Sequence, residues 1–389
     1  MFLSILQTRI IRAVLLLFGA IAIILNLSPT HYVQVIAQTQ SVEKPAPLHL
    51  ISNEILGTAK IYVVNLPTRS DKRDNIALGS SVSGFRVEWL HGVTPDQVNP
   101  KSIPHNWNPD HKPTEYAARR AHVNAMQQIV QGRLGSAIVM EDDVDWDVTI
   151  KTQLQGYALA VRALQGSEGI STGSPYGDDW DILWLGHCGL SYSAERPFFL
   201  SQPDPTVLPP HHFLPYWRDP PPIDRPDHTR LVCSVADAVC SMVYAVSYHG
   251  AQKILAALSV NPGHLAEQID IGAQFDVSLG RLCGHGYLRC FGAYPSLTGG
   301  FQPAGPLSKT SDIHDQNQDV HAAYSYGVMY STMLNIHRLL SKEKTVHATW
   351  EDVGVPLDVD PANFTVLGGS VAVAREQGRV HKIVDVSAD

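Results

Sequence analysis

The sequence predicts a single α/β domain built on a mostly parallel sheet with helices on both faces. From about residue 60 onward, short apolar runs rich in β-branched residues alternate with segments of helical periodicity. This alternation is typical of strands that are buried under helices on both sides of a sheet. The 389 residues, 44% of them hydrophobic and 17% charged, can build a core that needs no disulfides for its stability.

The first half of this domain is expected to contain three strands and two helices. The strands are placed at 60–66, 85–90 and 136–140. A turn over 67–73 opens a polar helix, and a loop rich in Pro, Asn and His covers 94–113. The next helix follows this loop, with Thr114 able to cap it and Gly132 ending it.

The second half continues the alternation. Strands are expected at 181–186 and 242–247, and helices at about 148–164, from a Ser247 cap to 257, at 269–283 and at 324–340. The segment 203–226 is so rich in proline that no regular element is expected there. We interpret it as an insertion loop, either a surface excursion or a lid that contacts a bound substrate.

An apolar segment near the N-terminus indicates a membrane anchor or a signal peptide. Residues 13–27 carry no charge and follow Arg9 and Arg12, and the apolar stretch approaches the length of about 20 residues that spans a bilayer. A cleavage site at 35–37 lies far from this run for a signal peptide. We favour an uncleaved anchor with the basic end in the cytosol and the bulk in the lumen. A sequon at Asn363 is compatible with that compartment.

The chain is therefore expected to consist of five consecutive parts. They are a short basic end (1–12), a signal anchor or transmembrane helix (13–29), a stem (30–57), the globular domain (58–340) and a C-terminal extension (341–389).

Charge and cysteine usage narrow the class of protein. A formal net charge of −8, with no basic run longer than Arg119-Arg120, argues against a general nucleic-acid-binding role. The five cysteines form no C-x-x-C pair, so no zinc site of that kind is expected. Two pairs share a seven-residue spacing, Cys233/Cys240 and Cys283/Cys290. Disulfides are chemically allowed in a lumenal protein, but burial as small apolar side chains is an equally good explanation.

Three consecutive acids, Glu141, Asp142 and Asp143, follow the strand at 136–140. Their carboxylates repel one another and cannot be buried without compensation. At the carboxyl end of a parallel strand they face the crevice where α/β sheets bind ligands. Mg²⁺ or Mn²⁺ would suit such hard oxygen donors and could bridge them to a nucleotide diphosphate. The alternative is that the acids only cap the following helix.

Polar residues at the end of the first strand form a second candidate site. Arg69 and Arg73 are spaced i to i+4, so on a helix they share one face that could contact a diphosphate or a ribose. The alternative is a solvated, charged start of a helix. His122 lies in the helix before the acidic strand, where a single histidine is more commonly structural than a ligand.

Five segments occur in a fixed order between residues 61 and 296, and together they resemble glycosyltransferase family 25, the lipooligosaccharide-biosynthesis and collagen-galactosyltransferase group. They are IYVVNLPTRSDKRDN (61–75), the segment 116–130 with Ala121-His122, AIVMEDDV (137–144), DWDILWLG (179–186) and YAVSYHGAQKIL (244–255). The order of all five is far more specific than any one of them.

The resemblance implies a GT-A-like fold, the sheet of nucleotide-diphospho-sugar transferases. It implies that a hexose, galactose or glucose, passes from a UDP-sugar to a hydroxyl of a glycan or glycoprotein acceptor, with inversion and with Mn²⁺ or Mg²⁺ as the cofactor. Together with the anchor, this predicts a single-pass type II protein of the Golgi or ER membrane with a lumenal catalytic domain, or alternatively a secreted one.

The resemblance also implies roles for individual residues. Glu141 and Asp143 would bind the metal. The nucleotide-sugar would lie against Asn65, Arg69, Arg73 and Asp142. Deprotonation of the acceptor needs a general base, for which Asp276 is preferred over Asp270. Either of these two acids could instead lie on a helix surface.

The sequence departs from the family pattern in three places. Ala121 replaces the usual small hydroxyl residue before His122, the proline-rich insertion has no counterpart, and the tail after about residue 341 lies outside the resemblance. Two other functions remain open: a sugar- or nucleotide-binding module of the same fold without catalysis, and a glycoside hydrolase that uses paired acids such as Glu141 and Asp181.

Overall fold

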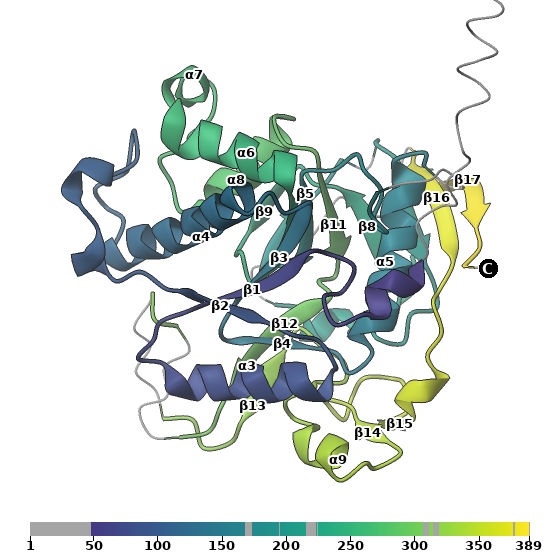
Figure 1. Ribbon diagram of the computed structural model, residues 1–389. Coiled ribbons are helices and arrows are strands. Elements are labelled where there is room, and N and C mark those ends of the chain that lie inside the picture. The colour runs from purple at the N-terminus through teal and green to yellow at the C-terminus, as the bar shows by residue number, and fades with distance from the viewer. Residues whose placement is uncertain are drawn as a thin grey trace, which may run out of the picture. The chain divides into compact units, whose positions relative to one another are not determined.

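A ten-stranded sheet forms the centre of the computed structural model, which describes residues 48–167, 173–193, 195–214, 223, 225–305, 311–313, 319–375 and 378–388 (Figure 1). In spatial order its strands are β17 (Val380–Val386), β16 (Gly369–Ala374), β7 (Phe198–Ser201), β8 (Arg230–Ser234), β11 (Cys290–Tyr294), β5 (Ile182–Gly186), β10 (Val243–Ser247), β3 (Ser136–Glu141), β1 (Lys60–Asn65) and β2 (Glu88–His91). Seven of the ten described strands run in one direction, and β10, β8 and β16 run against them.

The predicted mostly parallel sheet is therefore confirmed in strand direction. Neighbouring strands pair in parallel only within β2-β1-β3 and between β5 and β11, because the three reversed strands lie between the others. The strands expected at 60–66, 136–140, 181–186 and 242–247 are confirmed within one residue at each end, and the one expected at 85–90 begins later, at Glu88.

Helices cover both faces of the sheet. One face packs against α4 (Pro113–Gln131), α6 (Tyr248–Leu255) and α8 (Phe275–Gly284), and the other against α3 (Ser70–Val82) and α5 (Ile150–Leu164). Alternate strand residues supply the two cores: Tyr62 and Val139 point to the first face, and Val63 and Ile138 to the second. This period of two is the reason why the strands are apolar along their whole length.

Smaller elements surround this framework. A second sheet has the order β13 (Tyr324–Tyr326), β12 (Thr298–Gln302) and β4 (Val144–Trp146), and two-stranded sheets pair β6 (Gly189–Ser191) with β9 (Asp237–Val239) and β14 (Val346–His347) with β15 (Asp358–Val359). The short helices are η1 (Leu48–Ser52), η2 (Pro95–Gln97), η3 (Pro100–Ser102), η4 (Pro210–His212), η5 (Ala256–Val260), α7 (Gly263–Ala266), α9 (Ile336–Leu340) and η6 (Pro361–Asn363).

Three expectations about helices are wrong in detail. Helix α4 begins at Pro113, so Thr114 lies inside it and its hydroxyl donates to the carbonyl of Ile313 instead of capping. Residues 269–274 precede α8, because the carbonyls of Ile271 and Ala273 accept hydrogen bonds from the buried Arg119 and are not available to a helix.

The segment 324–340 is not one helix. It contains β13 and, at its end, α9. Between them, the Tyr330 amide donates to Asp147 and the Ser331 hydroxyl to Asp145. The Asp147 carboxylate thus takes the place of the carbonyl that a helix would offer to the Tyr330 amide, a known way for side chains to compete with secondary structure.

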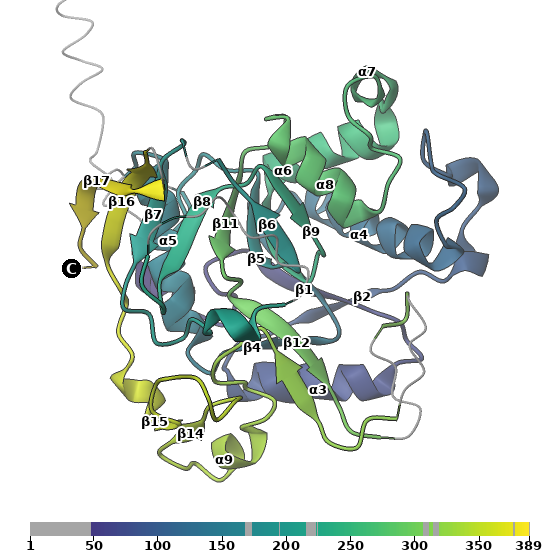
Figure 2. The same cartoon turned by 180° about the vertical axis from the view of Figure 1, so that it is seen from behind.

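The C-terminal residues belong to the central sheet. Strand β16 pairs with β7 and β17 pairs with β16, so residues beyond 341 extend one edge of the sheet (Figure 2). In the insertion 203–226, the described residue Leu208 packs against Met329 and Val353 of the C-terminal half. The expected N-terminal helix and stem up to residue 47 lie outside the described residues. In the part of the chain that is described, no helix is both long and apolar enough to cross a bilayer.

Four of the five cysteines form disulfides. Cys188 pairs with Cys240, and Cys283 pairs with Cys290, whereas Cys233 is a buried free thiol. Of the two pairs that share the seven-residue spacing, Cys283 and Cys290 are bonded to each other, whereas Cys233 and Cys240 are not. Cys233 lies within β8, where its side chain belongs to the apolar core of one sheet face.

The two disulfides are expected to differ in their effect on stability. Cys188–Cys240 spans 52 residues and Cys283–Cys290 spans 7. A loop-entropy argument gives about 4 kcal/mol for the former and about 2.5 kcal/mol for the latter. Urea unfolding of C188A/C240A and C283A/C290A double variants measures both losses, and a larger loss for the shorter loop would contradict this ranking.

The buried His187 is expected to make the fold acid-sensitive. Its Nε2–H donates to the Ala293 carbonyl at 2.8 Å, and burial lowers its pKa from 6.5 to about 4. The unfolded chain takes up this proton near pH 6.5 and the folded chain only near pH 4, so stability falls as the pH drops through that window. Relative to wild type, H187Q should gain up to about 1.4 kcal/mol per pH unit between pH 6.5 and 4. Unfolding curves across this range give the difference, and a constant gap would refute the assignment.

Candidate functional site

A cavity of about 470 Å³ opens at the carboxyl ends of β1 and β3. It is bordered by the start of α3, one side of α4, the loop before β10 and the start of α8. Glu141, Asp142 and Asp143 all line it. The acids thus face a crevice at the edge of the sheet where α/β proteins bind ligands.

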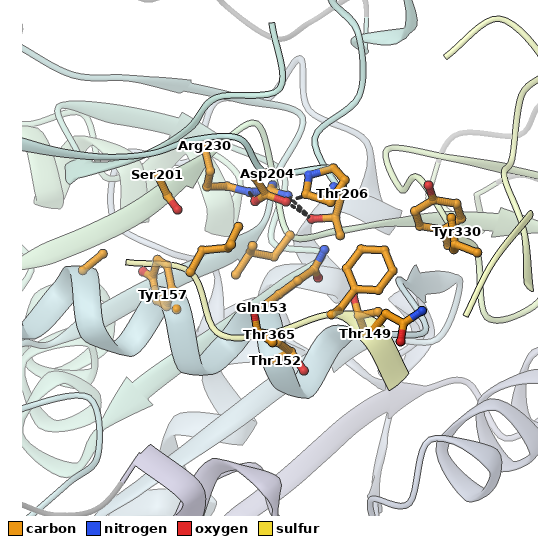
Figure 3. Close-up of a pocket in the computed structure, with 18 of the residues that line it drawn as sticks. Thr149, Thr152, Gln153, Tyr157, Ser201, Asp204, Thr206, Arg230, Tyr330 and Thr365 are labelled. Carbon is orange, nitrogen blue, oxygen red and sulfur yellow. Dashed lines mark hydrogen bonds and ion pairs between the residues drawn. The ribbon is translucent and has the colours of Figure 1, made fainter. Parts of the chain in front are cut away.

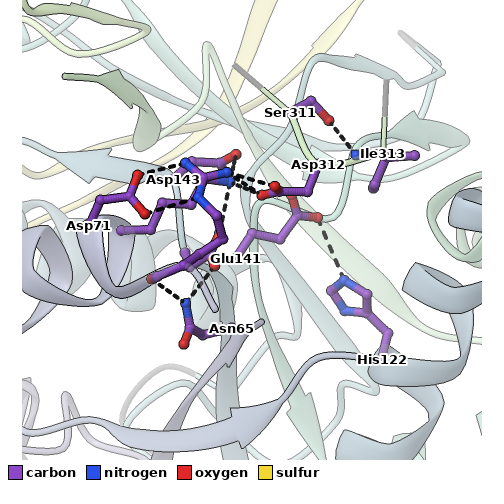
Figure 4. A network of polar contacts seen from close by, with 11 residues as sticks. Asn65, Asp71, His122, Glu141, Asp143, Ser311, Asp312 and Ile313 are labelled. Atoms are coloured by element: carbon purple, nitrogen blue, oxygen red, sulfur yellow. Dashed lines mark hydrogen bonds and ion pairs between the residues drawn. The ribbon is translucent and has the colours of Figure 1, made fainter. Parts of the chain in front are cut away.

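The three acids have different partners. Glu141 is the last residue of β3, and its carboxylate accepts a hydrogen bond from the Ser241 hydroxyl at 3.0 Å. Asp142 accepts from the side-chain amide of Asn65 at 2.8 Å. Asp143 contacts the ammonium of Lys72 at 3.0 Å. Figure 4 shows Asn65 and His122 approaching the acids from opposite sides.

Lys72 is the centre of this network, although nothing in the sequence distinguishes it from the other polar residues of its helix. Its Nζ lies 3.0 Å from a carboxylate oxygen of Asp142, 3.0 Å from Asp143 and 2.8 Å from Asp312. Only 5% of its side chain is exposed. A buried lysine requires such compensation, because an unpaired ammonium is strongly disfavoured away from water.

The two arginines do not act together. Arg69 precedes α3 and forms ion pairs with Asp312 at 2.6 Å and Asp71 at 2.7 Å, so it joins the network through Asp312. Arg73 instead lies over the ring of Trp89 in β2, 4.5 Å from its centroid. Neither belongs to the described residues that line the cavity. Arg69 is the N-cap of α3, and its side chain turns to Asp71 and Asp312, whereas that of Arg73 turns to Trp89. A contact of either arginine with a diphosphate or a ribose stays a prediction.

The network holds more negative than positive charge. Apart from His122, its described ionisable members are five carboxyl groups and two cations: Glu141, Asp142, Asp143, Asp312 and Asp71, with Lys72 and Arg69. Burial raises the pKa of Asp142 to about 6, although Lys72 opposes this, and burial likewise raises the pKa of Asp143. One ammonium cannot compensate both acids.

The pKa values of Glu141 and Asp312 are lowered, in contrast to those of Asp142 and Asp143. Burial raises the pKa of Glu141, but hydrogen bonds and charge from His122 outweigh it, so the pKa lies below its usual value. Burial acts in the same direction on Asp312, where Lys72 and Arg69 outweigh it and lower the pKa. Asp142 and Asp143 are therefore the two acids of the cluster whose pKa is raised, mainly by burial, although both contact the ammonium of Lys72.

The donor set fits a hard divalent cation in its chemistry, because all its candidate ligands are carboxylate oxygens and the surplus charge is negative. The oxygens are not gathered as a preformed ion site. Among the described residues, no three of these acids have ligand atoms within 4.8 Å of one another, since the Lys72 ammonium lies between them. Asp142 and Asp143 are the acids that border both the ammonium and the cavity.

Of the two acids expected as a general base, Asp276 lines the cavity and Asp270 does not. Asp276 lies in the first turn of α8, lines the cavity and accepts a hydrogen bond from the Cys240 amide at 2.6 Å. Burial raises its pKa. Asp270 is 62% exposed and pairs with Arg281 at 2.5 Å, outside the described cavity lining. Only Asp276 is therefore placed beside the acidic cluster.

His122 joins α4 to the acids. Its ring stacks on Phe275 with centroids 4.8 Å apart, its Nδ1 lies 3.1 Å from the Tyr244 hydroxyl, and its Nε2 lies 3.6 Å from Glu141. These contacts hold the ring in one orientation. His122 therefore lines the cavity, and it also packs α4 against Phe275 and Tyr244, which is the structural role expected of a single histidine in a helix.

A second cavity, also of about 470 Å³, lies between α5, the β7–β8 pair and the segment 356–367 (Figure 3). Its lining includes a buried ion pair between Arg230 and Asp204 at 3.0 Å. Arg230 also donates to the carbonyls of Pro295 and Ser296, so its guanidinium is engaged in holding the fold. The acidic cavity is therefore the better candidate for catalysis.

Glu141 and Asp181 cannot work as a pair. Glu141 ends β3, whereas Asp181 precedes β5, and the two strands run in the same direction on either side of β10. Glu141 therefore lies at the carboxyl ends of these strands and Asp181 at their amino ends, about 15 Å apart along the strand direction. Asp181 instead pairs with Lys253 at 2.6 Å.

Comparison with known proteins supports a relationship to glycosyltransferases in general. No model of a known protein family matches the chain. Procollagen galactosyltransferase 1 from Danio rerio is 24% identical over 178 residues, which cover 42% of this chain and 27% of that protein. The matched region thus spans about a quarter of the relative's length.

The Lys72 network is expected to contribute strongly to stability. K72M would leave three carboxylates around an uncharged side chain, at a cost of about 3–5 kcal/mol. The matched control is K60M, since Lys60 pairs with Glu88 at 2.8 Å on the surface and such pairs contribute at most about 1 kcal/mol. Urea unfolding compares the variants, and equal losses would contradict a central role for Lys72.

Proposed function

We propose that the protein is a glycosyltransferase with a GT-A-like fold that moves a hexose from a UDP-sugar to a hydroxyl of a glycan or glycoprotein. The observation that carries this proposal is the acidic cluster at the carboxyl end of β3, which borders a cavity large enough for a small ligand. The similarity to a protein named as a galactosyltransferase supports the class of reaction, and the ordered segments in the sequence favour family 25.

Asp142 and Asp143 are the residues that would hold a divalent cation, with Glu141 beside them. When bound, Mn²⁺ or Mg²⁺ would neutralise charge on the diphosphate leaving group. Lys72 supplies a fixed positive charge at the same edge and holds Asp142 and Asp143 in place. Asn65 restrains Asp142 through its side-chain amide.

Asp276 is the proposed general base. It borders the same cavity as the acids, and its carboxylate is oriented by the Cys240 amide. A base whose pKa is raised by burial removes a hydroxyl proton more readily than an ordinary carboxylate. A base on the protein suits an inverting transfer, in which the acceptor oxygen attacks the sugar directly.

The proposed location is the lumen of the Golgi or ER, with the N-terminal apolar segment as a single-pass type II anchor. Two disulfides support an oxidising compartment. Asn363, the acceptor of the sequon, is exposed. Protease protection in sealed microsomes tests this topology, and cleavage of the folded part from the cytosolic side would reject it.

Donor screening with purified full-length protein tests the reaction. We expect transfer or slow hydrolysis of UDP-galactose or UDP-glucose in the presence of Mn²⁺. D143N should lower turnover at least about a hundredfold, which corresponds to about 2.7 kcal/mol of transition-state stabilisation. D270N, with its exposed acid outside the cavity, should stay within about twofold of wild type.

The outcomes separate the alternatives. Full turnover in chelator would reject the metal and leave Lys72 as the cation of the site. UDP-sugar binding in calorimetry, with no product for any acceptor or water, would instead favour a non-catalytic binding module.

A further inference from the structure

A group of three potential metal ligands lies outside both cavities. His211 and His212 of η4 meet Asp352, which is about 140 residues further along the chain. The His211 Nε2 lies 3.1 Å from one carboxylate oxygen of Asp352, and the His212 Nε2 lies 2.6 Å from the other. Among the described residues this is the one set of three or more such side chains whose ligand atoms all lie within 4.8 Å of one another.

Local structure directs both imidazoles to the same point. Pro209 is extended and Pro210 opens the short helix, which fixes the backbone just before the two histidines. The His212 ring stacks on Trp350 with centroids 4.5 Å apart, and the His211 ring lies 4.2 Å from that of His212. The ligands are therefore supported by packing that does not depend on Asp352.

The distances suit a zinc-like ion. Zinc binds imidazole nitrogen and carboxylate oxygen at about 2.0–2.2 Å, so two ligands of a tetrahedral site are about 3.3 Å apart. The nitrogen–oxygen separations are 3.1 Å from His211 to one oxygen of Asp352 and 2.6 Å from His212 to the other, about 0.2 and 0.7 Å shorter than this spacing. One ligand atom from each of the three residues can be chosen so that all lie within 4.8 Å of one another, which small side-chain shifts can convert into a zinc site. Two imidazoles and one carboxylate favour Zn²⁺ over Mg²⁺ or Ca²⁺, which prefer oxygen ligands alone.

Exposure leaves room for solvent to complete the coordination. The side chains of His211 and Asp352 are 55% and 66% exposed, and that of His212 is 15% exposed. A site with three protein ligands and an open fourth position for water is a common zinc arrangement. Access from solvent also gives the ion a direct entry path.

We propose that His211, His212 and Asp352 bind one zinc ion, which fastens the proline-rich insertion to the C-terminal part of the domain. The two segments already pack together, since Leu208 of the insertion contacts a cluster that includes Val346 and Val353. The ion adds a directional link at the exposed rim of that cluster. This inference does not rest on the proposed transferase activity.

The test uses full-length protein that is stripped with chelator and then dialysed against limiting zinc. Wild type should retain one zinc per chain by mass spectrometry of the metal. H211A and D352N should bind zinc at least about tenfold more weakly, and because both side chains are exposed these variants should keep their fold. Zinc should raise the melting temperature of wild type and leave those of both variants unchanged.

The matched control is H347A. His347 pairs with Asp358 at 3.2 Å on the surface but belongs to no three-ligand group among the described residues. It should retain zinc like wild type. Absence of stoichiometric zinc in wild type would overturn the proposal, and so would unchanged retention in H211A and D352N, which would place the ion at other ligands such as the acids at 141–143.

Discussion

The contact of one buried ammonium with three carboxylates determines how the candidate site is built. Lys72 lies in the first turn of α3, and its partners Asp142 and Asp143 follow β3. Removing an ammonium from water is costly, and each carboxylate around it would be costly alone. Their mutual attraction makes the arrangement possible. It also fixes the start of α3 against the end of β3, so the position of the helix and the geometry of the acids depend on each other.

The order of strands explains which other groups reach the acids. Strand β10 is antiparallel to β3, so its amino end lies at the carboxyl edge of the sheet. The loop before β10 therefore passes the acids, and Ser241 in that loop donates to Glu141. The neighbouring amide of Cys240 donates to Asp276 at the start of α8. A purely parallel sheet would have placed this loop at the opposite edge.

The sequence predicts the parts of the site that follow from local pattern. Glu141, Asp142 and Asp143 stand out in the sequence because a run of acids after an apolar strand is unusual, whereas Asp276 is indicated only by the family resemblance. The sequence does not predict the roles of Lys72 and Asp312, because a lysine in a polar helix and an acid in a loop carry no periodic signal, and only tertiary contacts bury them. The i to i+4 spacing of Arg69 and Arg73 likewise does not predict their different partners, because Arg69 caps α3 and pairs with Asp71 and Asp312 while Arg73 lies over Trp89.

The disulfide between Cys188 and Cys240 also depends on tertiary structure, because its cysteines are 52 residues apart in the sequence. Cys188 follows β5 and Cys240 precedes β10, which lie side by side and antiparallel, so the sheet brings both cysteines to one edge. Their bond fixes the loop whose Cys240 amide orients Asp276. Reduction would leave this loop held by hydrogen bonds and packing alone. Oxidising conditions would therefore favour not only the stability of the fold but also the position of the acid best placed to accept a proton.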